Sequence, residues 1–191
     1  MIPSTGGSGP CIAALEIASI ASGFETADAI VKEATVDLLM ASSVTPGKYV
    51  LLFTGSVEDV SSALRRGIEV CADVLLDRLF IPNVEPTLLA FARGEGTPPP
   101  FLDAVGIIET LSVASTIRAG DIASKMASLQ LVSVALARGI GGKSYVTFTG
   151  EVSDVEAAVE AGSADAERAG MLVRRVVIPR PHRGMLEVLT A

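Results

Sequence analysis

The chain has 191 residues, which is enough for one domain or for two small ones. Hydrophobic residues make up 49% of it, but only 4% are aromatic and Trp is absent, so a core must consist of Ala, Val, Ile and Leu. The net charge of −7 and the scattering of the 15 basic residues argue against a nucleic-acid-binding surface.

Charged residues interrupt every apolar stretch before it reaches the roughly 18 to 20 residues that a membrane-spanning helix needs. The N-terminal region has no basic segment before its apolar run and carries Glu16 inside that run, which is unlike a secretory signal. We therefore expect a soluble, cytosolic protein without a membrane partner. Cys11 and Cys71 lack CxxC spacing, which favours two thiols over a disulfide framework or a zinc site.

The predicted elements begin after residues 1–10, "MIPSTGGSGP", which are expected to form a flexible tail. The first domain, residues 11–92, is expected to contain a strand (11–19), a helix (23–34), a hairpin (36–44 and 48–55), a helix (57–68) and a strand that ends at Ile81. Pro46 and Gly47 mark the turn of the hairpin.

Residues 93–103 are expected to form a semi-rigid linker, because their three consecutive prolines cannot join a strand ladder. The second domain, residues 104–191, repeats the series with a strand (104–112), a helix (116–127), a hairpin (129–137 and 143–150), a helix (152–162) and a strand that ends at Ile178. Ser56 and Glu151 each precede a predicted helix and are expected to cap its N-terminus.

Matched residues show that the two sets are copies of one unit. They are 93 residues apart in the first strand, as for Glu16 and Glu109, and 95 apart in the hairpin, as for Lys48 and Lys143. The order strand, helix, strand, strand, helix, strand is the ferredoxin-like arrangement. The predicted fold class is α+β, with two tandem ferredoxin-like domains in which two helices cover one face of a four-stranded antiparallel sheet.

One segment comes close to a phosphate-binding loop. "ARGIGGKS", residues 137–144, has Ala137 where the first glycine of GxxxxGK[ST] belongs, and Ser144 leads into a predicted strand. A phosphate loop needs a helix there, because the amides at the helix N-terminus hold the anion. We therefore interpret the segment as a hairpin turn whose glycines supply positive φ angles.

The sequence does not assemble a catalytic group. His182 is the only histidine, and it lies in a Pro-flanked turn, which excludes most triads and most multi-histidine metal sites. Glu16 and Glu109 hold matched positions in apolar strands. A shared structural role, such as a hydrogen bond to a neighbouring backbone, explains this duplication better than paired acid and base catalysis.

The chain resembles a bacterial microcompartment shell protein of the tandem-domain, trimer-forming class. "VGIIETLSVASTIRAGDIASKMA" and "VTFTGEVSDVEAAVEAGSADAERAG" in the second copy are similar to the strand–helix segments of that family, and "VVIPRPH" to its closing turn. In the first copy "AALEIASIASGFETADAIVKEA" and "FTGSVEDV" fit, whereas "FIPNVEP" departs from the closing turn. The order of the elements resembles the unpermuted, propanediol-type members.

The resemblance implies a homotrimer whose six domains imitate a hexagon and tile into a shell, with metabolites passing through a central pore. The implied partners are further copies, other shell proteins at tile edges and encapsulated enzymes. The implied pore-lining residues are Thr45, Pro46, Gly47, Ile140, Gly141 and Gly142. Lys48, Arg138 and Lys143 flank these turns and would favour anions, although a lysine that leaves a turn is more often solvated.

Lys32 and Lys125 match the edge lysine of the family, and Arg180 matches the arginine that supports the contact between tiles. Asn83 replaces this arginine in the first copy, so alternate edges are expected to differ in strength. Some relatives bind an iron–sulfur cluster through a cysteine in the pore loop. Both cysteines lie outside the loops, so we expect no cofactor and no metal.

Two alternatives remain open at this point. A trimeric regulator resembling the PII or ACT groups would bind nucleotides or amino acids between subunits. The sequence has neither the long loop nor the basic phosphate cluster that such a regulator needs. An enzyme is the weaker alternative.

Overall fold

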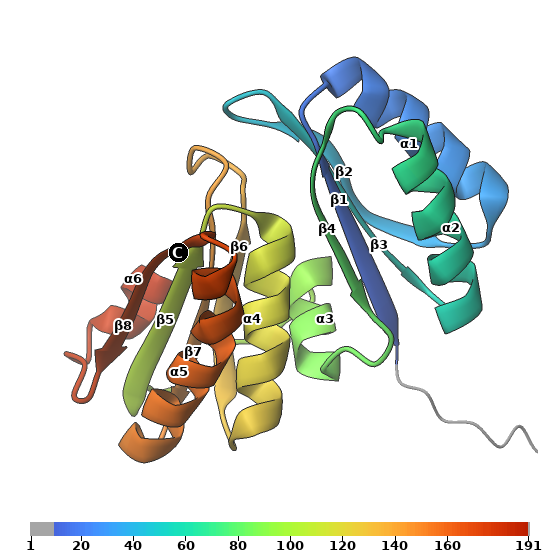
Figure 1. Ribbon diagram of the computed structural model, residues 1–191. Coiled ribbons are helices and arrows are strands. Elements are labelled where there is room, and N and C mark those ends of the chain that lie inside the picture. The colour runs from blue at the N-terminus through green and yellow to red at the C-terminus, as the bar shows by residue number, and fades with distance from the viewer. Residues whose placement is uncertain (1–9, 191) are drawn as a thin grey trace, which may run out of the picture.

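The computed structural model describes residues 10–190, and of the predicted tail only Pro10 lies within this range (Figure 1). The first domain consists of β1 (Cys11–Ile17), α1 (Ile20–Glu33), β2 (Asp37–Val44), β3 (Lys48–Gly55), α2 (Val57–Val70) and β4 (Leu75–Ile81). The second consists of β5 (Ala104–Thr110), α4 (Val113–Met126), β6 (Gln130–Leu136), β7 (Ser144–Gly150), α5 (Val152–Arg168) and β8 (Leu172–Ile178).

Both sheets have the same topology. The strand order is β2-β3-β1-β4 in the first domain and β6-β7-β5-β8 in the second, and every strand pair is antiparallel. This is the predicted ferredoxin-like arrangement, which is confirmed in both copies. The capping prediction is confirmed only for Ser56, whose Oγ accepts from the Asp59 N–H at 3.1 Å. It is wrong for Glu151, which makes no capping hydrogen bond through its side chain.

The two faces of the first sheet bury their side chains against different partners. In β1, Cys11, Ala13 and Leu15 face α1 and α2 of their own domain. Ile12 and Ala14 alternate with them and belong to a second core that includes residues of α4. Figure 1 shows α4 lying between the two sheets. The second domain therefore covers the face of the first sheet that its own helices leave open.

A helix that the sequence analysis did not predict completes this boundary. α3 (Pro86–Arg93) begins with proline at its first turn and ends at Gly94, which has a positive φ of 78°. Its Leu88 is fully buried, and α3 lies beside α4 in Figure 1. A second short helix, α6 (Met185–Leu189), follows β8 and was also not predicted.

The matched glycines Gly67 and Gly162 allow the two helices of each domain to approach closely. A Cβ on Gly162 would lie 2.6 Å from the backbone oxygen of Ala119, whereas a Cβ on Gly67 would first meet Leu15 Cδ1 at 2.7 Å. A side-chain tip yields more easily than a backbone atom does.

We therefore expect Gly162→Ala to lower the free energy of unfolding by roughly 1–3 kcal/mol, as overpacked cores do. Gly67→Ala serves as the matched control and is expected to cost less, because Leu15 can change its rotamer. Urea unfolding of the two variants and the parent chain measures both effects. Equal losses would contradict this account of the α4–α5 contact.

Candidate functional site

Each domain carries a hairpin turn at the same end of its sheet (Figure 1). Thr45, Pro46 and Gly47 join β2 to β3, and all three are exposed. Ile140 and Gly141 lie in the turn between β6 and β7 and are half-buried and exposed, respectively. The φ angles of Gly47 and Gly141 are 106° and 67°, a region that glycine adopts without strain.

The near-match to a phosphate loop is a hairpin turn, as predicted. Ser144 begins β7, so no helix follows the glycines. Gly142 has a φ of 76° and is buried. The segment therefore lacks the helix N-terminus that phosphate binding requires.

The two turns meet each other. A Cβ on Gly142 would lie 2.5 Å from the backbone oxygen of Thr45 and 3.1 Å from Pro46 Cδ. Lys48 Nζ also donates to the Gly142 oxygen at 3.3 Å. Glycine at position 142 is thus required both by its backbone angle and by the close approach of the turn from the other domain. This contact brings the predicted pore residues of the two copies side by side.

Glu16 ties the first sheet to the second domain. Its carboxylate is completely buried, accepts from Lys48 Nζ at 2.7 Å and from the backbone N–H of Ala114 at 3.1 Å. Lys48 Nζ donates in addition to the oxygen of Leu111 at 3.2 Å. The predicted backbone hydrogen bond of Glu16 is therefore confirmed. The Lys48 side chain is only 17% exposed, so its charge is directed into the boundary between the domains.

The matched pair in the second copy is more open. Lys143 Nζ lies 2.9 Å from Glu109 Oε1, and the two side chains are 47% and 31% exposed. Within residues 10–190, no backbone N–H donates to Glu109, so the shared backbone hydrogen bond predicted for the two matched carboxylates is found for Glu16 and not for Glu109. Arg138 is exposed beside this turn. The second copy thus repeats the ion pair of the first. The second domain covers the Glu16–Lys48 pair, whereas the Glu109–Lys143 pair remains partly exposed.

The predicted edge residues occupy different surroundings. Lys32 is 71% exposed and lies 2.6 Å from Asp28 Oδ2. Lys125 instead donates to Asp121 at 2.8 Å and to the oxygen of Asn83, and therefore joins α4 to the end of β4. Arg180 is exposed in the turn after β8.

Two aspartates that the sequence analysis did not interpret also bind across the boundary. Asp121 Oδ1 accepts from the backbone N–H of Glu85 at 2.8 Å. Asp77 Oδ2 accepts from Ser112 Oγ at 2.6 Å. The repeat could have identified Asp121, because it matches Asp28. Each of these aspartates lies four residues before a matched lysine, Lys32 or Lys125. No matched carboxylate identified Asp77, since Arg174 stands at its position in the second copy.

Burial keeps the two cysteines in the thiol form, whereas the single histidine is exposed. Cys11 and Cys71 are free and buried, which confirms the prediction of two thiols. Burial raises the pKa of Cys11 to about 11 and also raises the pKa of Cys71. His182 is exposed, and its Nδ1 accepts from the backbone N–H of Gly184 at 3.2 Å.

Residues 10–190 contain no helix that is long and apolar enough to cross a membrane. The same residues contain no group of three or more His, Cys, Asp or Glu side chains that could hold a metal ion. The buried carboxylates of Glu16 and Asp121 instead accept backbone N–H groups across the boundary between the domains.

The model of the BMC domain matches the chain twice, over residues 11–84 and residues 104–181. The chain belongs to the BMC domain family. Bacterial microcompartment shell protein PduT of Citrobacter freundii is 44% identical over 174 residues, which cover 91% of this chain and 94% of PduT. Bacterial microcompartment shell protein EutM of Salmonella typhimurium is 41% identical and covers 46% of this chain and 88% of its own.

A crystal structure of a microcompartment protein from Desulfitobacterium hafniense DCB matches with a TM-score of 0.85 and 45% identity, over 94% of this chain and 99% of that one. The chain is therefore a microcompartment shell protein with two tandem BMC domains, as its resemblance to the family indicated. It is part of a microcompartment shell. These relatives give no support to the PII- or ACT-like regulator.

Proposed function

We propose that three copies of this chain form a closed ring of six BMC domains, which serves as one tile of the shell. This proposal rests on the interface between the two domains, which occurs once within the chain although each domain carries a copy of both of its surfaces. The first sheet receives α4 of the second domain, whereas α1, which matches α4, packs against α2, β1 and β3 of its own domain. Within residues 10–190, the second sheet contacts α3 and the segment near Leu189 at β6 and β7, and no second copy of α4 lies on it. A head-to-tail interface that repeats around an axis closes into a ring.

The matched helices support this arrangement. Val113 and Ile117 of α4 are fully buried at the boundary, whereas their counterparts in α1, Ile20 and Phe24, are 41% and 63% exposed. Large apolar side chains exposed together on one helix favour a protein partner. A neighbouring copy supplies a matching surface, because its second sheet has the same fold as the sheet that α4 covers.

The polar contacts extend the same argument. Ala21 occupies in α1 the position that Ala114 occupies in α4, and Glu109 matches Glu16. In the proposed trimer the N–H of Ala21 therefore donates to Glu109 of the neighbouring copy, as the N–H of Ala114 donates to Glu16 within the chain. This contact would bury the half-exposed Glu109–Lys143 pair.

Ile20→Asp tests the trimer. Ile20 is the first residue of α1, where a carboxylate favours the helix, so the domain should still fold. The same carboxylate would be buried next to Glu109 of the neighbour, so we expect trimers to dissociate to monomers in analytical ultracentrifugation. Ala157→Asp, on the exposed side of α5, is the matched control and should stay trimeric. An Ile20→Asp variant that remains trimeric would rule out this interface.

The ring would have a pore at its axis. The adjacent turns of the two domains, with Thr45, Pro46 and Gly47 from one and Ile140, Gly141 and Gly142 from the other, are proposed as its lining. None of these residues is ionisable, so small metabolites would meet hydroxyl, backbone and apolar groups. Because Lys48 is bound to Glu16, Lys143 and Arg138 are the more accessible cations near the opening.

We propose a structural role without catalysis. The most buried ion pair within residues 10–190, between the Glu16 carboxylate and the Lys48 ammonium, is occupied by contacts between domains. Lys32, Lys125 and Arg180 are proposed as contacts with neighbouring tiles, and the proposed partners at these edges are other shell proteins. Encapsulated enzymes are the proposed contents of the shell.

A further inference from the structure

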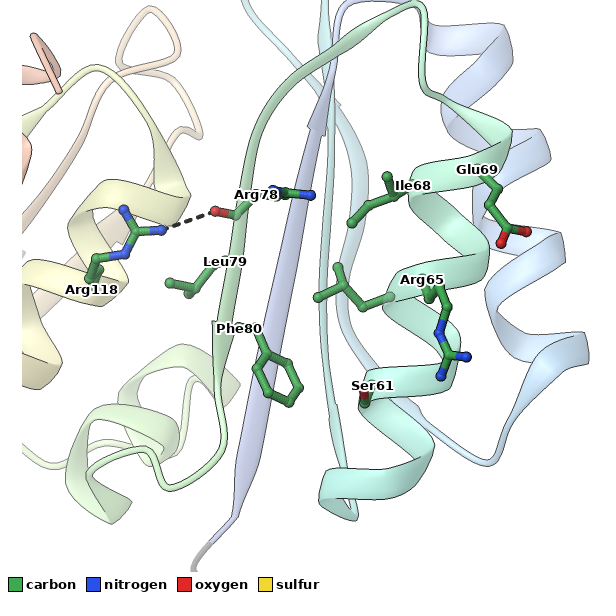
Figure 2. A pocket seen from close by; sticks show the side chains of 9 residues that line it. Ser61, Arg65, Ile68, Glu69, Arg78, Leu79, Phe80 and Arg118 are labelled. Carbon is green, nitrogen blue, oxygen red and sulfur yellow. Dashed lines mark hydrogen bonds between the residues drawn. The ribbon is translucent and has the colours of Figure 1, made fainter.

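A groove between α2 and β4 of the first domain has the composition of a ligand site. It has a volume of about 560 Å³, within the range of small-molecule pockets. Figure 2 shows Arg78 and Phe80 extending from β4 toward α2, and Ser61, Arg65 and Ile68 on the facing helix. The groove therefore lies on the side of β4 that faces the helices of its own domain.

The groove combines an apolar floor with two cations. Leu64, Ile68 and Phe80 form the apolar part, and Phe80 is 39% exposed. Among residues 10–190, neither Arg65 nor Arg78 makes an ion pair. Two guanidinium groups beside an apolar floor are complementary to an anion that carries a hydrocarbon group.

The other charges of the groove are already engaged. Arg118 of α4 donates to Asp165 and to the oxygen of Arg78, both at 3.1 Å. A hydrogen bond from Arg168, together with Arg118, holds the pKa of Asp165 below its usual range. Glu69 lies 3.3 Å from Arg66. Arg65 and Arg78 thus remain the cations available to a ligand.

The second domain provides an internal comparison. Arg175 matches Arg78, but Glu160 stands where the first domain has Arg65. Arg175 pairs with Glu160 at 3.0 Å and with Glu167 at 3.3 Å, and it donates to Ser163 Oγ at 3.0 Å. The corresponding groove measures about 210 Å³. In the second domain the Glu160 carboxylate therefore neutralises the arginine of β8, whereas the first domain has a second arginine, Arg65, at that position.

We propose that the groove of the first domain binds a small organic anion, with its hydrocarbon part on Leu64, Ile68 and Phe80. Its carboxylate or phosphate is held by Arg78 and by Arg65, whose side chain lies along α2 in Figure 2 and turns toward Arg78 on binding, as the matched Glu160 reaches Arg175 in the second domain. The groove stays open in the trimer, since the proposed ring contacts involve α1 and the second sheet. The helix that approaches this groove from the other domain is α4 of the same chain, through Arg118. The site therefore does not depend on the proposed oligomer.

Isothermal titration of the full chain with hexanoate and with hexyl phosphate tests the site and distinguishes the two acid groups. We expect one site per chain in the first domain, and no binding of the uncharged control hexanol at the same concentration. Arg65→Glu introduces the residue of the second domain and should weaken binding at least about tenfold, since the carboxylate would pair with Arg78. Arg78→Met keeps an apolar side chain of similar length and should weaken binding to a similar extent. It serves as the test if Arg65→Glu does not fold.

The reciprocal variant is Glu160→Arg with Glu167→Ala, which frees Arg175 and reproduces the first groove in the second domain. It should bind a second equivalent of the same anion. The proposal is overturned if neither anion binds the parent chain at millimolar concentration, if hexanol binds as well, or if Arg65→Glu and Arg78→Met bind as the parent does. Circular dichroism of each variant shows whether the domains remain folded.

Discussion

Replacing Glu16 with Ala is expected to destabilise the chain by about 3–5 kcal/mol, the usual cost of breaking a buried ion pair by removing one partner. The substitution leaves the Lys48 ammonium, whose side chain is 17% exposed, without its carboxylate. It also leaves the N–H of Ala114 without an acceptor at the start of α4. Urea unfolding at a fixed protein concentration measures the loss.

The double variant Glu16→Ala, Lys48→Met controls for the stranded charge. Methionine keeps an apolar side chain near the position of the lysine stem, so much of the lost stability should return. If the double variant is as unstable as Glu16→Ala alone, the cost does not come from the unpaired ammonium. The role assigned to Lys48 would then be wrong.

Glu109→Ala distinguishes the boundary within the chain from the proposed boundary between chains. In a single chain Glu109 is 31% exposed, and its pair with Lys143 should contribute less than about 1 kcal/mol. In the proposed trimer it is buried as Glu16 is, so its loss should weaken association, and sedimentation should show trimers dissociating at a higher protein concentration than in the parent chain. Glu16→Ala should lower the stability of the chain without this shift in the dissociation concentration.

The duplication made the sheets and their main helices predictable from the sequence. Residues such as Glu16 and Glu109 recur 93 residues apart in the first strand, and those of the hairpin recur 95 apart, so each copy served as a test of the other. α3 was not predicted because the sequence around Pro86 departs from the second copy. Its N-terminal proline and terminal Gly94 were signals of a helix, but they adjoin a Pro-rich segment that favoured a linker.

The sequence predicted which turn or helix holds each residue of the candidate site better than it predicted the contacts that the residue makes. Gly142 was assigned to one turn and Lys48 to the flank of the other, but the hydrogen bond between them joins residues of different domains. Likewise, Lys125 was assigned to an edge, whereas its bond to the oxygen of Asn83 forms only after α4 packs against the first domain. Periodicity reports which face of an element is buried, and it contains no information about which domain covers that face.

Replacing both Lys32 and Lys125 with Ala is expected to abolish sheet formation while trimers persist. Lys32 is 71% exposed, and its 2.6 Å bond to Asp28 spans one helical turn, so its ammonium can reach a neighbouring tile without breaking the fold. Lys125 is more constrained, because it also binds the backbone of Asn83. Its loss should lower stability by less than about 1 kcal/mol, as expected for a partly exposed pair.

Electron microscopy at matched protein concentrations measures the sheets, and sedimentation measures the trimers. Arg168→Ala is the control, since it also removes an exposed cation, 77% exposed and 3.1 Å from Asp165, away from the proposed edge. The single variants separate the two edges. If Lys32→Ala alone abolishes sheets while Lys125→Ala leaves them, Lys125 acts mainly between the domains of one chain. If the double variant still forms sheets, the assignment of both lysines to the tile edge is wrong.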